Sequence, residues 1–249
     1  MGRAFEYRKA AKFARWDRMA KQFARIGKEI AMAVKEGGPD PETNPALRRA
    51  MQNAKGVNMP KDNVERAIKK ASGADAEVYD IVTFEGYAPH GIGIFIECAS
   101  NNNNRTVANV RAIFNKVGGN LGKNGELAFM FDRKGIFTIE ADRVTMDWDD
   151  FELELIDAGA EDIEKEDGLI TIYSDFEDFG NVSHKLDALD IEVKNAEIQR
   201  IPNTTKKLSV EEGKEILDII DRFEQDEDVQ NVYHTLEITP ELEEALGED

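Results

Sequence analysis

The sequence contains little of the chemistry on which most enzymes and secreted proteins depend. Cys98 is the only cysteine among 249 residues, which excludes an intramolecular disulfide and a zinc site built from several thiolates. Its neighbours Phe95 and Ile96 predict that Cys98 is a small apolar side chain in a buried strand. No run of about 18 apolar residues occurs, so the sequence predicts no membrane-spanning helix.

Signals for targeting and for catalysis are also missing. The start of the chain is charged at once, at Arg3 and Glu6, and has no apolar signal segment, which favours the cytoplasm. Neither a Walker A loop nor a dinucleotide-binding fingerprint occurs. None of the histidines, His90, His184 and His234, has a sequence neighbour that completes a nucleophile pair or a metal motif. We therefore expect no enzymatic activity, no cofactor and no metal.

Basic residues are scarce in most of the chain but abundant at its start. Residues 1–72 contain 17 Lys and Arg against 8 Asp and Glu, whereas residues 73–249 contain 15 against 42. The net charge is therefore +9 in the first segment and −27 in the second, and the whole-chain value of −18 hides this difference. A basic head on an acidic body is typical of a module that binds a polyanion.

The basic head begins with a long predicted helix over residues 8–36. Its apolar residues recur at steps of three and four from Trp16 to Val34 and form one stripe. Basic residues from Arg18 to Lys28 form a second stripe, shifted by two residues, or about 200° around the helix. Such cations can contact a phosphate backbone and release its counterions. A solvated helix face is the alternative, but acidic residues do not alternate along this stripe as they do on a salt-bridged face.

Two shorter helices complete the predicted head. Asn44 is the expected N-cap of the first, with Pro45 at the first helical position and Gly56 at the end. Pro60 opens the next helix, over residues 61–71, and the spacing loosely matches a helix-turn-helix, as any helical hairpin in a small bundle does. The predicted nucleic-acid-binding residues of the head are Arg8, Lys9, Lys12, Arg15, Arg18, Lys21, Arg25, Lys28, Lys61, Arg66, Lys69 and Lys70.

Residues 78–133 contain more predicted strands than helices. Strands are expected at residues 80–87, 91–99 and 127–132, and Asn104 is expected to cap a helix over residues 105–117. A strand thus runs into a helix N-terminus through Asn101–Thr106, and such a junction can bind an anion. Two interpretations stay open, an anion-binding loop and an ordinary N-cap. The candidate anion-binding residues are Asn103, Asn104, Arg105 and Thr106.

Residues 134–201 follow the order strand, helix, strand, strand, helix, strand, which is the ferredoxin-like arrangement. This block holds 20 acidic against 6 basic residues. A helix over residues 209–225 and a strand near residues 228–236 follow, and we expect them to return and complete the preceding sheet. The predicted fold class is α+β with three domains: a helical basic domain (1–76), a discontinuous α+β domain (77–133 plus 202–240) and an inserted ferredoxin-like domain (134–201). Residues 241–249 are expected to form a frayed acidic tail.

Several strings resemble the YebC/PmpR family (the DUF28 proteins), and the resemblance spans nearly the whole chain. The matching strings are Gly37–Pro41, Asn44-Pro45, Met59–Ile68, Phe84–Tyr87, Asn102–Val107, Gly118–Gly122 and Met130–Gly135. One departure concerns the start, where the family often has Gly-His-Ser-Lys-Trp and this chain has Gly2-Arg3-Ala4-Phe5-Glu6. Contacts made by that His, Ser or Lys therefore cannot be carried over.

The resemblance implies a basic helical head, two α+β domains with one inserted in the other, and no enzymatic activity. It implies a regulator of gene expression, of the kind described as a probable transcriptional regulator that binds DNA. A similar mitochondrial protein is a translational activator of cytochrome c oxidase subunit I, so docking on ribosomal RNA and a role in translation is the alternative. The acidic α+β domains are expected to contact a protein partner, and an adaptor that uses these domains alone is a third possibility. No membrane partner is expected.

Overall fold

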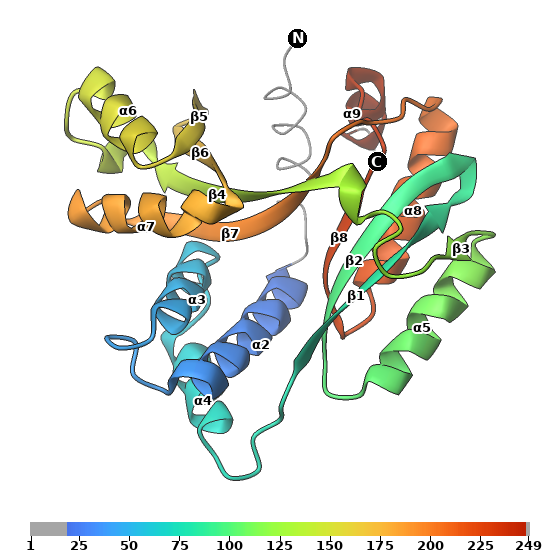
Figure 1. Ribbon diagram of the computed structural model, residues 1–249, viewed down its shortest axis with the longest axis horizontal. Coiled ribbons are helices and arrows are strands. Elements are labelled where there is room, and N and C mark those ends of the chain that lie inside the picture. The colour runs from blue at the N-terminus through green and yellow to red at the C-terminus, as the bar shows by residue number, and fades with distance from the viewer. Residues whose placement is uncertain (1–18, 248–249) are drawn as a thin grey trace. The chain divides into compact units, whose positions relative to one another are not determined.

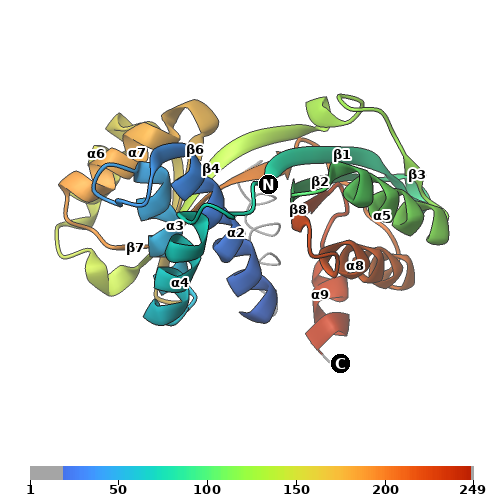
Figure 2. The same ribbon diagram turned by 90° about the horizontal axis from the view of Figure 1, so that it is seen from below.

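The computed structural model describes residues 19–247, and these residues form two compact units. Residues 77–132 and 201–247 belong to one unit, and residues 19–76 and 133–200 belong to the other. Helices and two antiparallel sheets build the chain (Figures 1 and 2), so the predicted α+β class is confirmed, with a helical head and one ferredoxin-like part inserted in another α+β part. The residue limits of the three predicted domains stay a prediction.

The head consists of helices α2 (Met19–Gly37), α3 (Pro45–Gly56) and α4 (Lys61–Ala71), which Figure 2 shows as a small bundle. The predicted N-cap is confirmed, because the Asn44 side chain accepts a hydrogen bond from the backbone N–H of Leu47 at 3.0 Å. The same amide donates to the carbonyls of Ala33 and Gly38, and so it joins the end of α2 to the start of α3. Ile30 and Leu47 are fully buried between the helices.

In the first unit, four strands pair in the order β3-β1-β2-β8. β1 (Asp80–Ala88) and β2 (Ile92–Ser100) form an antiparallel hairpin through the predicted turn at Pro89–Gly91. β8 (Val229–His234) pairs antiparallel with β2, so the C-terminal part of the chain returns to this sheet as predicted. β3 (Asn120–Leu121) is a short edge strand that the sequence did not indicate.

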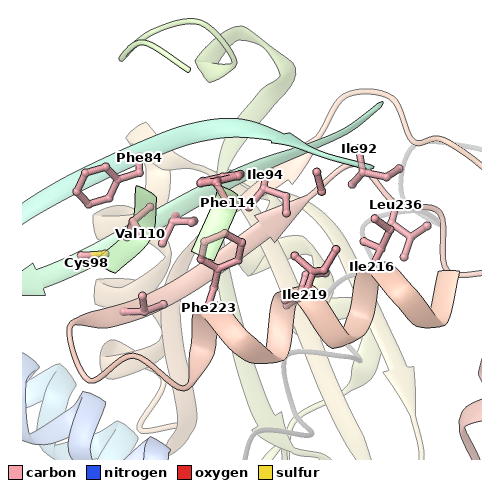
Figure 3. Packing of buried hydrophobic residues seen from close by; sticks show 14 of the residues in the cluster. Phe84, Ile92, Ile94, Cys98, Val110, Phe114, Ile216, Ile219, Phe223 and Leu236 are labelled. Carbon is pink, nitrogen blue, oxygen red and sulfur yellow. The ribbon is translucent and has the colours of Figure 1, made fainter. Parts of the chain in front are cut away.

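Helices α5 (Asn103–Lys116) and α8 (Val210–Glu224) cover one face of this sheet and form its core. Phe114 of α5 and Phe223 of α8 meet with their ring centroids 4.8 Å apart (Figure 3). Cys98 of β2 is fully buried in the same cluster, as predicted. The core therefore joins segments that lie more than a hundred residues apart in the sequence.

Two local predictions for this unit are wrong. Asn102 caps α5 in place of Asn104, because its side chain accepts a hydrogen bond from the backbone N–H of Arg105 at 3.2 Å. Residues 127–130 are not a strand, since Ala128–Met130 form a 3-10 turn. The buried carboxylate of Glu85 causes this difference: it accepts hydrogen bonds from the backbone N–H groups of Gly125 and Leu127 and holds the segment in a loop.

The expectation of a frayed tail is also wrong for the described residues. Helix α9 (Pro240–Gly247) packs against α8, and Leu242 is only 3% exposed. The close approach depends on Gly213 of α8, because a Cβ at this position would lie 2.8 Å from the Leu242 side chain. The acidic composition of this segment predicted a frayed end, but one apolar residue, Leu242, packs beside Gly213 and holds the helix in place.

The inserted part contains β4 (Phe131–Glu140), α6 (Trp148–Asp157), β5 (Ala160–Glu166), β6 (Leu169–Asp175), α7 (Phe179–Ala188) and β7 (Val193–Pro202). The strand order β5-β6-β4-β7 is that of a ferredoxin-like sheet, with α6 and α7 packed on it through Phe151, Leu155 and Val182. Asp167 and Gly168 both have positive φ, 51° and 76°, as the predicted tight turn between β5 and β6 requires.

Candidate nucleic-acid interface

The outer face of α4 is an exposed basic surface within the described part of the chain. Val64 and Ala71 fix the orientation of α4, because both are buried against the other helices of the head. Arg66 lies two residues after Val64 and Lys69 two residues before Ala71, about 200° around the helix, so both point to the opposite side. Lys61 and Lys70, near the two ends of α4, are exposed as well. We call this set the α4 basic surface; it consists of Lys61, Arg66, Lys69 and Lys70.

Local contacts on α4 leave its cations able to meet phosphate. Lys61 lies 3.6 Å from Glu65, and both side chains are largely exposed. Arg66 donates to the side chain of Asn63 at 2.6 Å and to the carbonyl of Asp62 at 3.3 Å. Exposed pairs of this kind contribute about 0–1 kcal/mol, so a phosphate can displace them at little cost.

The predicted stripe on α2 is less exposed than the sequence suggested. Lys21, Arg25 and Lys28 are half-buried, whereas Lys35, at the end of α2, is exposed. Arg8, Lys9, Lys12, Arg15 and Arg18 lie outside the described residues. The described structure therefore brings four of the predicted residues together on α4 and three on α2.

Helix α3 packs on the edge strand β7 of the ferredoxin-like part, a contact that sequence reasoning missed. The Asn53 amide donates to the carbonyl of Ala196 at 3.0 Å, and its oxygen accepts from the N–H of Ala196 at 2.8 Å. Asn53 thus pairs with β7 as a neighbouring strand would, and it covers a sheet edge that would otherwise be open. Asn53 is 6% exposed, and a buried amide needs a specific partner, but the sequence gives no sign of this burial.

An ion pair, a cation–π contact and a close backbone approach also join α3 to the acidic ferredoxin-like part. Lys55 forms an ion pair with Glu192, which lowers the pKa of that carboxyl. The guanidinium of Arg49 lies 5.4 Å from the ring centroid of Phe179. Gly56 touches the backbone of β7, where a Cβ would overlap the carbonyl oxygen of Lys194. These contacts fix the head and the ferredoxin-like part to each other within one unit.

Glu29 of α2 is a carboxyl whose pKa is raised. Burial, and then the negative charge of Glu197, raise the pKa of Glu29 to about 7, although Arg49 and Arg25 oppose the shift. The Glu29 carboxyl binds its proton more tightly in the folded state than in the unfolded state. The free energy of unfolding therefore falls as the pH rises from the unfolded pKa near 4.5 towards the folded pKa near 7. Above about pH 7 the loss is complete, and the contribution of Glu29 to stability no longer changes with pH.

Replacing Glu29 with Gln should therefore stabilise this unit only at neutral and alkaline pH. The expected gain at pH 8 is on the order of 3 kcal/mol, because the pKa rises from 4.5 to about 7 and one pKa unit corresponds to about 1.4 kcal/mol. At pH 4.5 the gain should be close to zero. Urea denaturation of both proteins at the two pH values checks this, and an equal difference at both would contradict it.

Polar side chains in Asn101–Thr106 form hydrogen bonds within the protein. The guanidinium of Arg105 donates to both oxygens of Asp228 at 2.8 Å, and the hydroxyl of Thr106 donates to the same carboxylate at 2.7 Å. Asp228 is 1% exposed and also accepts from Ser100 at 3.2 Å. Arg105 thus already has an anion as its partner, which favours a structural role for this junction. Asn103 and Asn104 are exposed, and anion binding there stays a prediction.

Two histidines have distinct surroundings in the described part of the chain. His90 lies between Glu212 and Glu215, at 3.3 and 2.9 Å, a contact between a turn and α8 that no sequence neighbour indicated. Burial lowers the pKa of His234 to about 4, so its imidazole is neutral. No group of three or more His, Cys, Asp or Glu side chains could hold a metal ion in this range. No helix in it is long and apolar enough to span a bilayer.

Comparisons with known proteins cover both parts of the chain. Residues 3–74 match the family model described as the TACO1/YebC protein N-terminal domain, and residues 79–236 match the model for the second and third domains. The chain belongs to the TACO1/YebC family. The resemblance read from the sequence is thereby confirmed.

The relatives of this TACO1/YebC member share its full length. It is 54% identical over 238 residues to a probable transcriptional regulatory protein of Flavobacterium psychrophilum, covering 95% of this chain and 100% of that one. A protein of the same description from Porphyromonas gingivalis is 51% identical over 236 residues, covering 95% and 97%. The crystal structure of a conserved hypothetical protein from Aquifex aeolicus has a TM-score of 0.74 and 35% identity, over 88% of this chain and 90% of that one. The names of the Flavobacterium and Porphyromonas relatives indicate a regulatory protein rather than an enzyme.

Proposed function

We propose that this chain is a non-enzymatic, cytoplasmic regulator of gene expression that binds nucleic acid through its head, with duplex DNA as the target. The observation that carries the proposal is the α4 basic surface, four exposed cations on one helix of a chain whose net charge is −18. Phosphate is the group that such a surface attracts most strongly. The description of the relatives as probable transcriptional regulators supports DNA as the target.

The acidic remainder of the chain favours contact with a polyanion through the head alone. Residues 73–249 carry a net charge of −27, so a phosphate backbone repels them while it attracts α4. Contacts made by lysine and arginine on an exposed helix are mainly to the backbone and carry no sequence information by themselves. Sequence preference would have to come from other residues of the head or from the shape of the duplex.

The test is the salt dependence of duplex binding. A protein using the four α4 cations should show log K falling with log salt at a slope of about −3.6, since each contact contributes about −0.9. Replacing Arg66, Lys69 and Lys70 together with Gln should reduce the slope to about −1 and weaken binding at 0.1 M salt by about 100-fold or more. Fluorescence anisotropy with a labelled duplex measures both quantities.

A matched control uses exposed lysines of the other unit. Lys116, Lys123 and Lys207 are exposed there, so changing them to Gln removes the same charge from a surface that the proposal does not use. This control should leave the slope unchanged. Equal losses in the two triple variants, or a slope near zero for the unchanged protein, would contradict the proposal.

A further inference from the structure

Helix α6 buries one side and leaves two large aliphatic residues on the other. Phe151 and Leu155 are fully buried in the core of the ferredoxin-like part. Leu153 and Ile156 are 60% and 57% exposed, and their spacing of three residues makes them neighbours on the helix surface. The fold gains little from either side chain, because the packed side of α6 is already complete. Adjacent exposed aliphatics on a helix mark a surface that another molecule can cover.

The surroundings of these two residues are acidic. Asp149 lies four residues before Leu153, Asp157 lies four residues after it, and Asp150 is on the same exposed side. Among the described residues, no ion pair involves any of these three carboxylates. We call this surface the α6 face; it consists of Asp149, Asp150, Leu153, Ile156 and Asp157.

The end of α6 adds more negative charge. The last turn of the helix holds Asp157 and no basic residue, although the exposed carbonyls of a helix C-terminus favour a cation. Gly159 lies close to Asp178, since a Cβ on this glycine would be 2.5 Å from the Asp178 side chain. A positively charged group placed here would therefore meet carboxylates and helix carbonyls together.

We propose that the α6 face is a docking surface for a protein segment that is rich in Lys and Arg and also carries aliphatic side chains. The carboxylates would pair with the cations of the segment, and Leu153 and Ile156 would pack against its apolar residues. This partner is separate from the nucleic acid proposed for the head, and the inference does not depend on that function.

The chemistry of the face argues against other occupants. Nucleic acid and anionic lipid would be repelled by three carboxylates with no nearby cation on α6. A second copy docking through the same face would bring like charges together around the two aliphatic residues. A small apolar ligand would find no concave site on the outer side of a single helix. A basic and partly apolar segment is the class that satisfies both features.

The test titrates the full-length chain with two designed peptides. Both are 16-residue, highly basic helices with the same number of lysines, one with leucine and the other with serine at the remaining positions. In methyl-labelled NMR spectra, the Lys/Leu peptide should shift the methyl signals of Leu153 and Ile156 more than others. It should also bind about tenfold more tightly than the Lys/Ser peptide.

Variants separate the α6 face from other exposed apolar surface. Leu153→Ser with Ile156→Ser should reduce the affinity for the Lys/Leu peptide to that of the Lys/Ser peptide. Val78 and Ile81 are 51% and 59% exposed in the other unit, so Val78→Ser with Ile81→Ser is the matched control and should leave both affinities unchanged. Equal binding of the two peptides, or largest shifts outside α6, would overturn the proposal. Unchanged core methyl signals in each variant show that it is folded.

Discussion

Replacing Gly56 with Ala should loosen the helical head from the ferredoxin-like part and destabilise that unit by about 3 kcal/mol, as overpacking at a rigid contact does. The added Cβ would overlap the carbonyl oxygen and carbon of Lys194. Both atoms belong to the backbone of β7, so no side-chain rotation can relieve the overlap. Helix α3 would have to move away from β7.

Hydrogen exchange at one amide reports this movement. The N–H of Ala196 donates to the Asn53 side chain at 2.8 Å, so its exchange should be slow in the unchanged protein and much faster in the Gly56→Ala variant. Gly27→Ala is the control, because a Cβ on Gly27 has no neighbour within 4 Å and alanine favours a helix. Slow exchange at Ala196 in the Gly56→Ala variant would show that α3 does not depend on close contact with β7.

Replacing Asp228 with Ala should destabilise the other unit by about 3 kcal/mol, because it removes a buried carboxylate that accepts several hydrogen bonds at once, one group of them from a guanidinium. The carboxylate of Asp228 accepts hydrogen bonds from Ser100, Arg105 and Thr106, which belong to β2 and to the start of α5. One side chain next to β8 thus joins the C-terminal segment to residues more than a hundred positions earlier. Chemical denaturation of the full chain measures the loss.

A second variant identifies the network as the cause. Asp218 of α8 belongs to the same unit and is exposed. Asp218→Ala should therefore cost less than 1 kcal/mol of folding free energy. If the two substitutions destabilise the protein equally, the buried position of Asp228 has no special role.

Elements with a strong local pattern could be predicted from the sequence. Helix α4 has the predicted limits, residues 61–71, because Pro60 precedes it and Ser72-Gly73 follow it. The ferredoxin-like order was also predicted, since α6, α7 and the four strands each carry their own apolar period. The positions of Asn44 and Ser209 at helix N-termini follow from the same local chemistry.

Contacts between distant segments could not be predicted in the same way. Asn53 and Ala196 are 143 residues apart, and neither has a local signature of their pairing. In the sequence, Asp228 is one of several acidic residues in an acidic segment, so its ion pair with Arg105 was missed and the junction at Asn101–Thr106 suggested an anion site. Likewise, α9 depends on Leu242 beside Gly213, a fit that only the folded chain reveals.

At the candidate interface too, the features that depend on local sequence could be predicted, whereas those that depend on distant contacts could not. The exposure of Arg66 and Lys69 follows from the helical repeat, and the structure shows that Lys61 and Lys70 are exposed too. The partial burial of Lys21, Arg25 and Lys28 does not follow from that repeat, because it depends on what α2 meets in three dimensions. We therefore weight α4 over α2 in the proposed contact with phosphate.

The most direct test of the central proposal is ultraviolet crosslinking of the tagged protein in cells, followed by sequencing of the recovered DNA and RNA. The account predicts enrichment of discrete DNA segments that is lost in the variant with Arg66, Lys69 and Lys70 changed to Gln and retained in the variant with Lys116, Lys123 and Lys207 changed to Gln. Enrichment of ribosomal RNA at fixed positions, with DNA at background, would contradict DNA as the target and would make the protein a translation factor.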